Sequence, residues 1–193
     1  MKRLLLTMII ILSLAETATA QMLALRTDAV PYMAFAPNIG AEIVTGNKTT
    51  FMVEAIGAYH SFGTNMIAVG ASPEFRYWFH GRPMSRGFLG ASLFGAAYRW
   101  HNYEETTPMA ERRTYKGKVG AAALTFGYVW GLGKRERWNM ELRGGLGAYR
   151  YSEKSRYSVK GTKERPAEKG WAILPYKVGL SFSYILPVEP RNK

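Results

Sequence analysis

The stretch LPYKVGLSFSY, residues 174–184, decides the fold because large apolar side chains alternate along it with small or polar ones. One face would carry Leu174, Tyr176, Val178, Leu180, Phe182 and Tyr184, and the other Lys177, Gly179, Ser181 and Ser183. Successive side chains of a β-strand point to opposite faces of the sheet. The period of two therefore predicts a strand that is apolar on one side and polar on the other.

The same period recurs along the chain, for example where Glu74 and Arg76 alternate with Phe75 and Tyr77. We expect eight strands, over residues 22–32, 38–46, 50–60, 65–79, 87–101, 115–131, 137–152 and 170–186. Several exceed the roughly 5–6 residues of a usual strand, whereas a strand that crosses a membrane needs roughly 9–11 residues. With 20 glycines, 13% aromatic residues and no long amphipathic helical run, the sequence predicts an all-β fold. Its form would be a closed antiparallel up-and-down β-barrel of the membrane type.

The pattern is less regular within the strand expected at 87–101. Leu89 and Leu93 do not share a face with Phe94 and Tyr98. This irregularity predicts a β-bulge or a glycine patch that faces lipid.

The connections between the expected strands alternate in length. Residues 46–48, 81–83 and 133–135 would form short turns, whereas the segments 102–114 and 153–169 are long, polar and charged. Outer-membrane barrels have short periplasmic turns and longer external loops. We therefore expect both termini in the periplasm and two long basic loops outside.

Aromatic residues near the strand ends would then lie at both membrane interfaces. The periplasmic rim would carry Trp78, Phe79, Trp130, Trp138 and Tyr184, and the outer rim Tyr32, Tyr59, Tyr98, Trp100, Tyr149, Tyr151 and Trp171.

The first twenty residues have the features of a secretory signal peptide. Lys2 and Arg3 precede an apolar run over residues 4–14, and Ala18-Thr19-Ala20 offers small residues to signal peptidase. The run is short for a membrane-spanning helix, which needs roughly 20 residues. We expect a signal peptide at 1–20, an outer-membrane barrel at 21–186 and a periplasmic tail at 187–193.

The composition restricts the partners and cofactors. The chain has no cysteine, which excludes disulfides, thiolate metal sites and a lipoprotein anchor. Its formal net charge is +12. Removal of the first twenty residues takes away Lys2, Arg3 and Glu16, a net charge of +1, and leaves +11 for the mature chain. An exported chain of this charge would meet anionic lipid and lipopolysaccharide rather than nucleic acid. Glycine runs such as 144–147 lack the helix and lysine of a phosphate-binding loop, so we expect no cofactor.

If the apolar face meets lipid, the opposite face places charged side chains inside the barrel. These are Arg26, Asp28, Glu42, Glu54, Glu74, Arg76, Glu141, Arg143 and Lys177. The interior of an eight-stranded barrel is just wide enough for side chains to fill, and buried charges persist only when they are paired. We therefore expect a salt-bridged plug and a structural barrel rather than a porin. A proton or ion relay is the alternative for the same residues.

The last strand also resembles the signal that the outer-membrane insertion machinery reads, which is a polar residue, a glycine and two aromatic residues. These would be Lys177, Gly179, Phe182 and Tyr184. The chain departs from the common form of this signal because the segment 185–193 follows the last aromatic residue.

The segment 153–169 holds more bases than acids. Its bases are Lys154, Arg156, Lys160, Lys163, Arg165 and Lys169. Because the segment is expected outside, these side chains would contact lipopolysaccharide phosphates, and a solvated loop is the alternative. The three histidines, His60, His80 and His101, have no partner at metal-ligand spacing, so we expect no metal site.

Two other functions remain open at this point. A lipid-modifying outer-membrane enzyme would use His60, Ser61 and Glu54, but adjacent strand residues point to opposite faces and the G-x-S-x-G motif is absent. We therefore expect no catalysis. A soluble periplasmic barrel that binds a small apolar ligand would have the reverse orientation, with its apolar face inside.

Five stretches of the mature chain carry a family resemblance. They are Ala24-Leu25-Arg26-Thr27, Ala36-Pro37-Asn38-Ile39-Gly40-Ala41-Glu42, Pro73-Glu74-Phe75-Arg76-Tyr77-Trp78-Phe79, Gly127-Tyr128-Val129-Trp130 and Lys134-Arg135-x-Arg137-Trp138-Asn139-x-Glu141. The chain resembles domain-of-unknown-function family 3575, which comprises small exported outer-membrane-type barrel proteins of Gram-negative anaerobes. The resemblance implies a barrel without known activity, and some relatives lie near fimbrial or surface-assembly genes, which implies surface-assembly partners. Many relatives have cysteines in the last external loop, which this chain lacks.

Overall fold

In the residues that the structure describes, the protein is an antiparallel all-β structure with one short helix. We describe it from a computed structural model, which covers residues 22–60, 65–102, 107–108, 112–134, 137–157 and 165–186. The strands are β1 Leu23–Asp28, β2 Asn38–Gly46, β3 Thr49–Tyr59, β4 Asn65–Trp78, β5 Arg86–His101, β6 Arg113–Leu132, β7 Trp138–Tyr157, β8 Glu168–Pro175 and β9 Gly179–Leu186, and the helix is α2 Ala29–Met33. The expected signal peptide and the tail at 187–193 lie outside the described residues, so both boundaries stay predictions.

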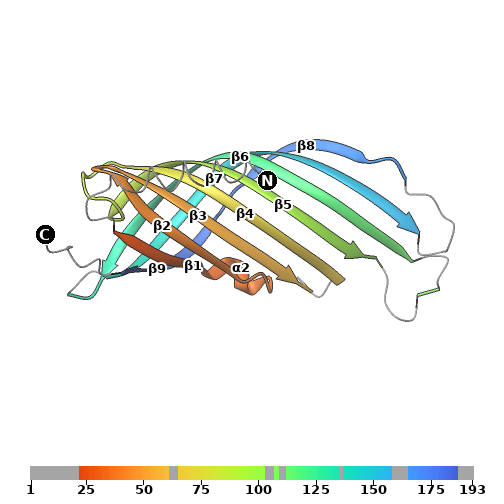
Figure 1. The fold of residues 1–193 in the computed structure, drawn as a ribbon, viewed down its shortest axis with the longest axis horizontal. Helices are drawn as coiled ribbons and strands as arrows, with labels where there is room; N and C mark the ends of the chain where they lie inside the picture. Colours follow the sequence, from red (N-terminus) through yellow and green to blue (C-terminus); the bar gives the residue numbers. More distant parts are fainter. Residues whose placement is uncertain are drawn as a thin grey trace, which may run out of the picture.

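The strands form one sheet that closes on itself, which we call the ring (Figure 1). Each strand from β1 to β7 pairs with the next along the chain. The last ring position is shared, because β8 and β9 pair with different parts of β7 and β9 also pairs with β1. Nine strands therefore occupy eight positions, and the predicted antiparallel up-and-down all-β fold is confirmed.

The last expected strand, 170–186, is wrong as one continuous element. It is interrupted between Pro175 and Gly179, where Lys177 has a left-handed backbone conformation with φ of 49°. This interruption, which we call the kink, changes the alternation. Tyr176 is buried in the ring instead of lying on the outer face as its spacing predicted, and Lys177 also points inward.

Three further predictions on the strands need correction. The expected strand 22–32 ends at Asp28, and α2 follows it. The expected long loop 153–169 is mostly strand, because β7 continues to Tyr157 and β8 begins at Glu168. Of the two alternatives expected for 87–101, the bulge is absent, because β5 keeps one register with β6 from Arg86 to His101, whereas exposed glycines do meet on the outer face, where Gly95 pairs with Gly120. Phe94 and Tyr98 instead take inward positions and the two leucines take outward ones.

The two faces of the ring differ in chemistry. On β4, Phe75 is 49% exposed while Glu74 and Arg76 are at most 1% exposed. Each of the nine strands contributes at least one exposed large apolar side chain, such as Leu25, Ile39, Phe51, Phe75, Leu93, Leu124, Leu146, Ile173 and Phe182. The apolar face is therefore outside and the charged face inside, opposite to what the soluble ligand-binding barrel requires. Among the described residues, no helix is both long and apolar enough to cross a membrane.

Several aromatic residues expected at a rim point into the ring instead, among them Trp78, Tyr98, Trp100 and Tyr149. Trp78 is fully buried and packs against Phe88 with ring centroids 5.0 Å apart. Its indole nitrogen donates to the Thr50 hydroxyl over 3.0 Å. Trp78, Phe88, Met84 and Val129 form an apolar cluster near the short turns, and this cluster fills that end of the ring.

Candidate functional site

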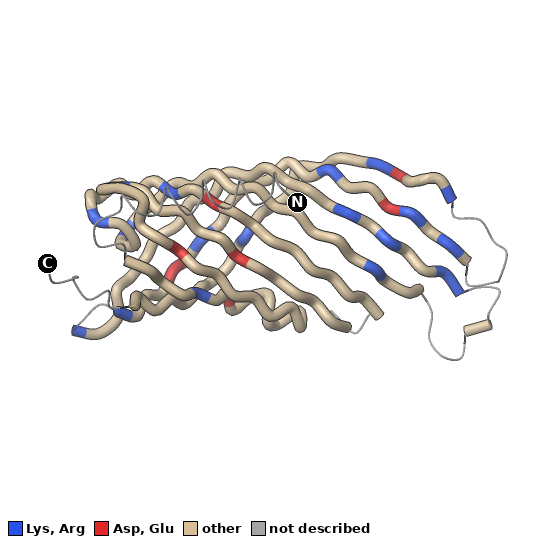
Figure 2. Tube along the Cα trace, viewed as in Figure 1, with Lys and Arg blue, Asp and Glu red and all other residues tan. Residues whose placement is uncertain are grey.

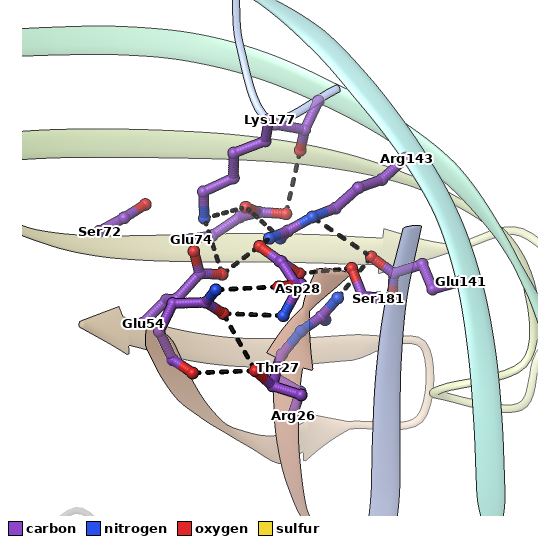
Figure 3. Close-up of polar contacts among 12 residues, drawn as sticks. Arg26, Thr27, Asp28, Glu54, Ser72, Glu74, Glu141, Arg143, Lys177 and Ser181 are labelled. Atoms are coloured by element: carbon purple, nitrogen blue, oxygen red, sulfur yellow. Dashed lines mark hydrogen bonds and ion pairs between the residues drawn. The ribbon is translucent and has the colours of Figure 1, made fainter. Parts of the chain in front are cut away.

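A layer of paired charges crosses the interior of the ring. It contains all nine residues that the sequence analysis assigned to the lumen: Arg26, Asp28, Glu42, Glu54, Glu74, Arg76, Glu141, Arg143 and Lys177. We call this set the ionic layer. It draws on β1, β2, β3, β4, β7 and the kink, and Figure 3 shows part of it with side chains converging from opposite walls. Inward positions of strands far apart in the sequence thus meet at one level.

Arg76 is the centre of one half of the ionic layer. Its Nε donates to Glu74 Oε1 over 2.7 Å, and its Nη1 lies 3.0 Å from Glu141 Oε2 and 3.3 Å from Glu42 Oε2. Arg26 bridges the last two carboxylates from β1, with 3.2 Å to Glu42 and 2.7 Å to Glu141. The Arg76 guanidinium also lies 4.2 Å from the centre of the Phe88 ring. One fully buried cation therefore holds three carboxylates and the apolar cluster together.

Arg143 and Lys177 organise the other half. The Arg143 Nη2 donates to Asp28 and, over 2.8 Å, to Glu54 Oε2. Lys177 reaches from the kink to Glu74 over 3.2 Å and to Glu54 over 3.5 Å. Removing one partner of such a buried pair leaves the other charge uncompensated, which costs roughly 3–5 kcal/mol. The kink thus places its lysine where two acids need a cation.

Neutral hydroxyl groups complete the hydrogen bonding of the carboxylates, and the sequence analysis did not single them out. Thr50 donates to Glu42 over 2.6 Å, Thr125 to Glu74 over 3.0 Å and Ser181 to Asp28 over 2.5 Å. All three lie at inward positions of their strands and are buried. The sequence could have indicated them, because each is a hydroxyl residue that the period of two places on the same face as the charges. Ser181 did fall on the predicted polar face.

A second interior cluster lies where Tyr176 enters the ring. Its hydroxyl group is 2.7 Å from Ser72 Oγ and 2.8 Å from Ser92 Oγ, and the two serine oxygens are 3.0 Å apart. Phe94 packs against the Tyr176 ring with centroids 6.4 Å apart. This cluster was not predicted, because the period of two in the sequence assigns Tyr176 to the outer face.

Bases gather at the end of the ring opposite the short turns, which we call the long-strand end (Figure 2), and several of them are exposed on its outer face. The exposed side chains are Arg99, Lys116, Lys118, Arg150, Lys154, Arg156 and Lys169, which we call the outer basic surface. They are neighbours across β5 to β8, since Lys116 pairs with both Arg99 and Lys154. The outward positions of β5 to β8 carry no acid in the described residues. Only Lys154, Arg156 and Lys169 were expected here, and they lie on strands rather than in a loop.

The other predicted lipopolysaccharide contacts are placed differently. Arg165 precedes β8 and lies 5.7 Å from the centre of the Tyr157 ring. Lys160 and Lys163 lie outside the described residues. Glu153, which the sequence placed in the same loop, points inward instead and accepts hydrogen bonds from Tyr98 and Trp100.

The four residues of the expected insertion signal do not share one straight strand. Lys177 lies in the kink with its amine in the ionic layer, and Gly179 begins β9. Phe182 faces outward, and Tyr184 packs against Trp138 with ring centroids 4.8 Å apart. The two aromatic residues are therefore neighbours on the outer side of β9, near the short turns.

The residues considered for catalysis or metal binding show no such assembly. Glu54 is engaged by Arg143 and Lys177, and His60 follows β3 with its ring 4.3 Å from that of Tyr59. Ser61 lies outside the described residues. Within the part of the chain that the structure describes, no group of three or more acidic or histidine side chains could hold a metal ion.

Comparison with protein families gives one match. Residues 5–186 match the model of the family described as "Protein of unknown function (DUF3575)". No curated protein and no solved structure matches the chain. The predicted family resemblance is confirmed by this match.

Proposed function

The chain belongs to this family of proteins of unknown function, and from that premise we propose that it is a non-enzymatic outer-membrane β-barrel. Its ionic layer closes the interior, and its outer basic surface binds lipopolysaccharide phosphates. The observation that carries the proposal is the orientation of the ring, with exposed apolar side chains on every strand and the ionic layer inside.

A membrane position explains why this orientation is stable. In water, an apolar face on all nine strands would be a large exposed hydrophobic patch, which soluble monomers rarely have. In a bilayer the same face is solvated by acyl chains, and a closed ring satisfies its backbone hydrogen bonds internally. A strand needs roughly 9–11 residues to cross a membrane. Strands β2 and β3, with 9 and 11 residues, fall within this range, and β4 to β7, with 14 to 20 residues, exceed it.

The interior supports a structural role rather than conduction. The ionic layer and the Trp78 cluster occupy successive levels inside the ring, and their side chains are almost completely buried. The pairing also leaves few of the donors and acceptors of the ionic layer free to hydrate a pore. We therefore expect the reconstituted protein to conduct no ions above the background of the bilayer.

Fractionation tests the membrane position most directly. The full chain is expressed in a Gram-negative host, and the envelope is separated on a density gradient. We expect the mature protein in the outer-membrane fraction, soluble only with detergent, with a mobility shift on gels when it is boiled. Recovery as a soluble protein in the periplasmic fraction would contradict the proposal.

The outer basic surface lies directly beyond the apolar band, at the level of lipid head groups. Leu93, Leu124 and Leu146 face outward on the same strands that carry Arg99, Lys118 and Arg150. Charge-assisted hydrogen bonds to phosphate are short and strong. A basic row at this level is thus matched to the phosphates of lipid A.

Charge removal on the two ends of the ring tests this contact. Lys116, Lys118 and Arg150 are changed together to Gln, and the control changes Lys48, Arg82 and Lys134 at the short turns. We expect the first variant to retain several-fold less lipopolysaccharide during purification and the control to retain as much as the unaltered protein. Equal retention by all three proteins would exclude the outer basic surface as the binding site.

A lipid-modifying activity is the alternative function, and the contacts of Glu54 argue against it. A carboxylate held by Arg143 and Lys177 is poorly placed to orient a histidine at the end of the strand. We expect lipid A from cells that express the protein to keep its mass. A mass change that is lost in the His60→Ala variant would support the enzyme instead.

A further inference from the structure

A cavity lies inside the ring, next to the ionic layer on the side of the long-strand end, and α2 forms part of its wall. It has a volume of about 260 Å³. Its walls are mostly apolar and come from distant parts of the chain, with Val30 from α2, Ile56 from β3, Phe94 from β5, Tyr149 from β7 and Val178 from the kink. Ligand pockets are commonly concave, mostly apolar and equipped with a few polar groups, and drug-sized ligands need roughly 300–1,000 Å³. This volume suits a smaller molecule, such as a single alkyl chain.

The wall beside the cavity is interrupted. Strand β1 ends at Asp28, and α2 takes its place next to β9. Val30 of α2 packs directly on Gly179, because a Cβ added to Gly179 would lie 2.8 Å from Val30 Cγ2. Among the described residues β8 pairs with β7 alone, so its second edge has no strand beside it. A gap of this kind beside an apolar cavity offers a route from the bilayer into the ring, if the protein lies in a membrane as proposed.

Arg143, one of the residues that line the cavity, has a hydrogen-bond donor that the ionic layer does not use. Arg143 lines the cavity and is 4% exposed, and its Nη2 serves Asp28 and Glu54. Its Nη1 is buried without a hydrogen-bond acceptor among the described residues and lies 4.0 Å from Glu74 Oε2. A buried donor without a partner costs free energy, so an acceptor atom in the cavity would be stabilising.

The charge of the layer decides which acceptor fits. Five carboxylates face four cations, so the ionic layer has an excess of one negative charge when all groups are ionised. An anionic ligand would add a second uncompensated negative charge in a poorly solvated interior. A neutral carbonyl oxygen accepts the same hydrogen bond without this penalty.

From these features we infer that the cavity binds one neutral acyl chain, with its ester carbonyl oxygen on Arg143 Nη1 and its alkyl part against Ile56 and Phe94. The ester could be a free small molecule or a chain that remains attached to a membrane lipid. Both sources present the same chemistry to the cavity.

Titration with three probes of equal chain length tests the inference. The full mature protein is purified in detergent with methyl-labelled valine and isoleucine, and methyl decanoate, decanoate or decane is added while the Val30 methyl signals are followed by NMR. We expect saturable shifts with the ester and roughly tenfold weaker binding of decane, because decane makes no hydrogen bond to the charged donor. Decanoate should also bind more weakly than the ester. Absent saturation with the ester, or equal binding of all three probes, would overturn the inference.

A matched pair of variants locates the site. Ile56→Trp fills the cavity, whereas Ala55→Trp adds the same side chain at the next position, which faces outward. We expect the first variant to lose ester binding and the second to keep it. Equal binding in both variants would show that the ester occupies another place, such as the outer face.

An experiment in nanodiscs distinguishes the two sources of the acyl chain. A phospholipid with a paramagnetic label on its acyl chain should broaden the Ile56 methyl signal if a lipid-borne chain enters the ring. Broadening only by a labelled free ester would identify a small molecule, and broadening by neither would contradict the inference. The outcome is independent of the fractionation test, because a protein of the outer membrane could have an empty cavity.

Discussion

The interior of the ring is packed differently at its two ends. Near the short turns, long charged side chains and Trp78 occupy the whole cross-section, and the largest side chains are completely buried. Toward the long-strand end, Tyr98 and Trp100 both donate to Glu153, and a cavity remains below them. The comparison shows that the alternating pattern fixes which side chains point inward but not how densely they pack.

The largest expected effect is at the densely packed end. Arg76→Ala would leave Glu42, Glu74 and Glu141 without their shared cation, and we expect a loss of roughly 3–5 kcal/mol in the free energy of unfolding. Denaturant unfolding of the protein folded in detergent or vesicles measures this loss. Lys48→Ala, an exposed change at a short turn, is the control and should change stability little. A loss below about 1 kcal/mol for Arg76→Ala would mean that the layer is not structural.

The next effect probes close packing at the long-strand end. A Cβ on Gly117 would lie 2.2 Å from the Tyr98 ring, whereas a Cβ on Gly95 would meet nothing within 4 Å. Since Tyr98 would have to move away from Glu153, Gly117→Ala should cost roughly 1–3 kcal/mol of stability. Gly95→Ala is the matched control on the neighbouring strand. Equal unfolding midpoints for the two variants would contradict the packing of Tyr98 over Gly117.

These two ends also differ in what the sequence could predict. Every member of the ionic layer was predicted from strand alternation alone. Charged residues that alternate with apolar ones share the face opposite the apolar face, and in a closed ring that face is the interior. Tyr176 and the 153–169 segment were misplaced for physical reasons. The positive φ of Lys177 shifts the alternation by one residue, and polar side chains on β7 and β8 look like a loop although they continue a sheet. The wall of the cavity includes α2, and no periodic pattern in the sequence predicted this helix.

A smaller effect is expected at the Tyr176 cluster, between the two ends. Tyr176→Phe removes the hydroxyl group shared by Ser72 and Ser92, which still bond to each other over 3.0 Å. We expect a loss of about 1 kcal/mol, the usual net value of one hydrogen bond. The unfolding midpoint measures it, and Tyr77→Phe on the exposed face of β4 is the control. A loss as large as that of Arg76→Ala would show that Tyr176 also supports the kink.

The smallest effect contrasts two arginines on the same strand. Arg143 points into the ring and is 4% exposed, whereas Arg150 points outward and belongs to the outer basic surface. Arg150→Ala should change the free energy of unfolding by less than about 0.5 kcal/mol, because an exposed charge is solvated in both states. The same unfolding assay, run without lipopolysaccharide, measures it. Adding lipopolysaccharide should then stabilise the unaltered protein more than the variant, since a ligand that binds only the folded state raises its stability. If the two proteins are stabilised equally, Arg150 does not contact the lipid.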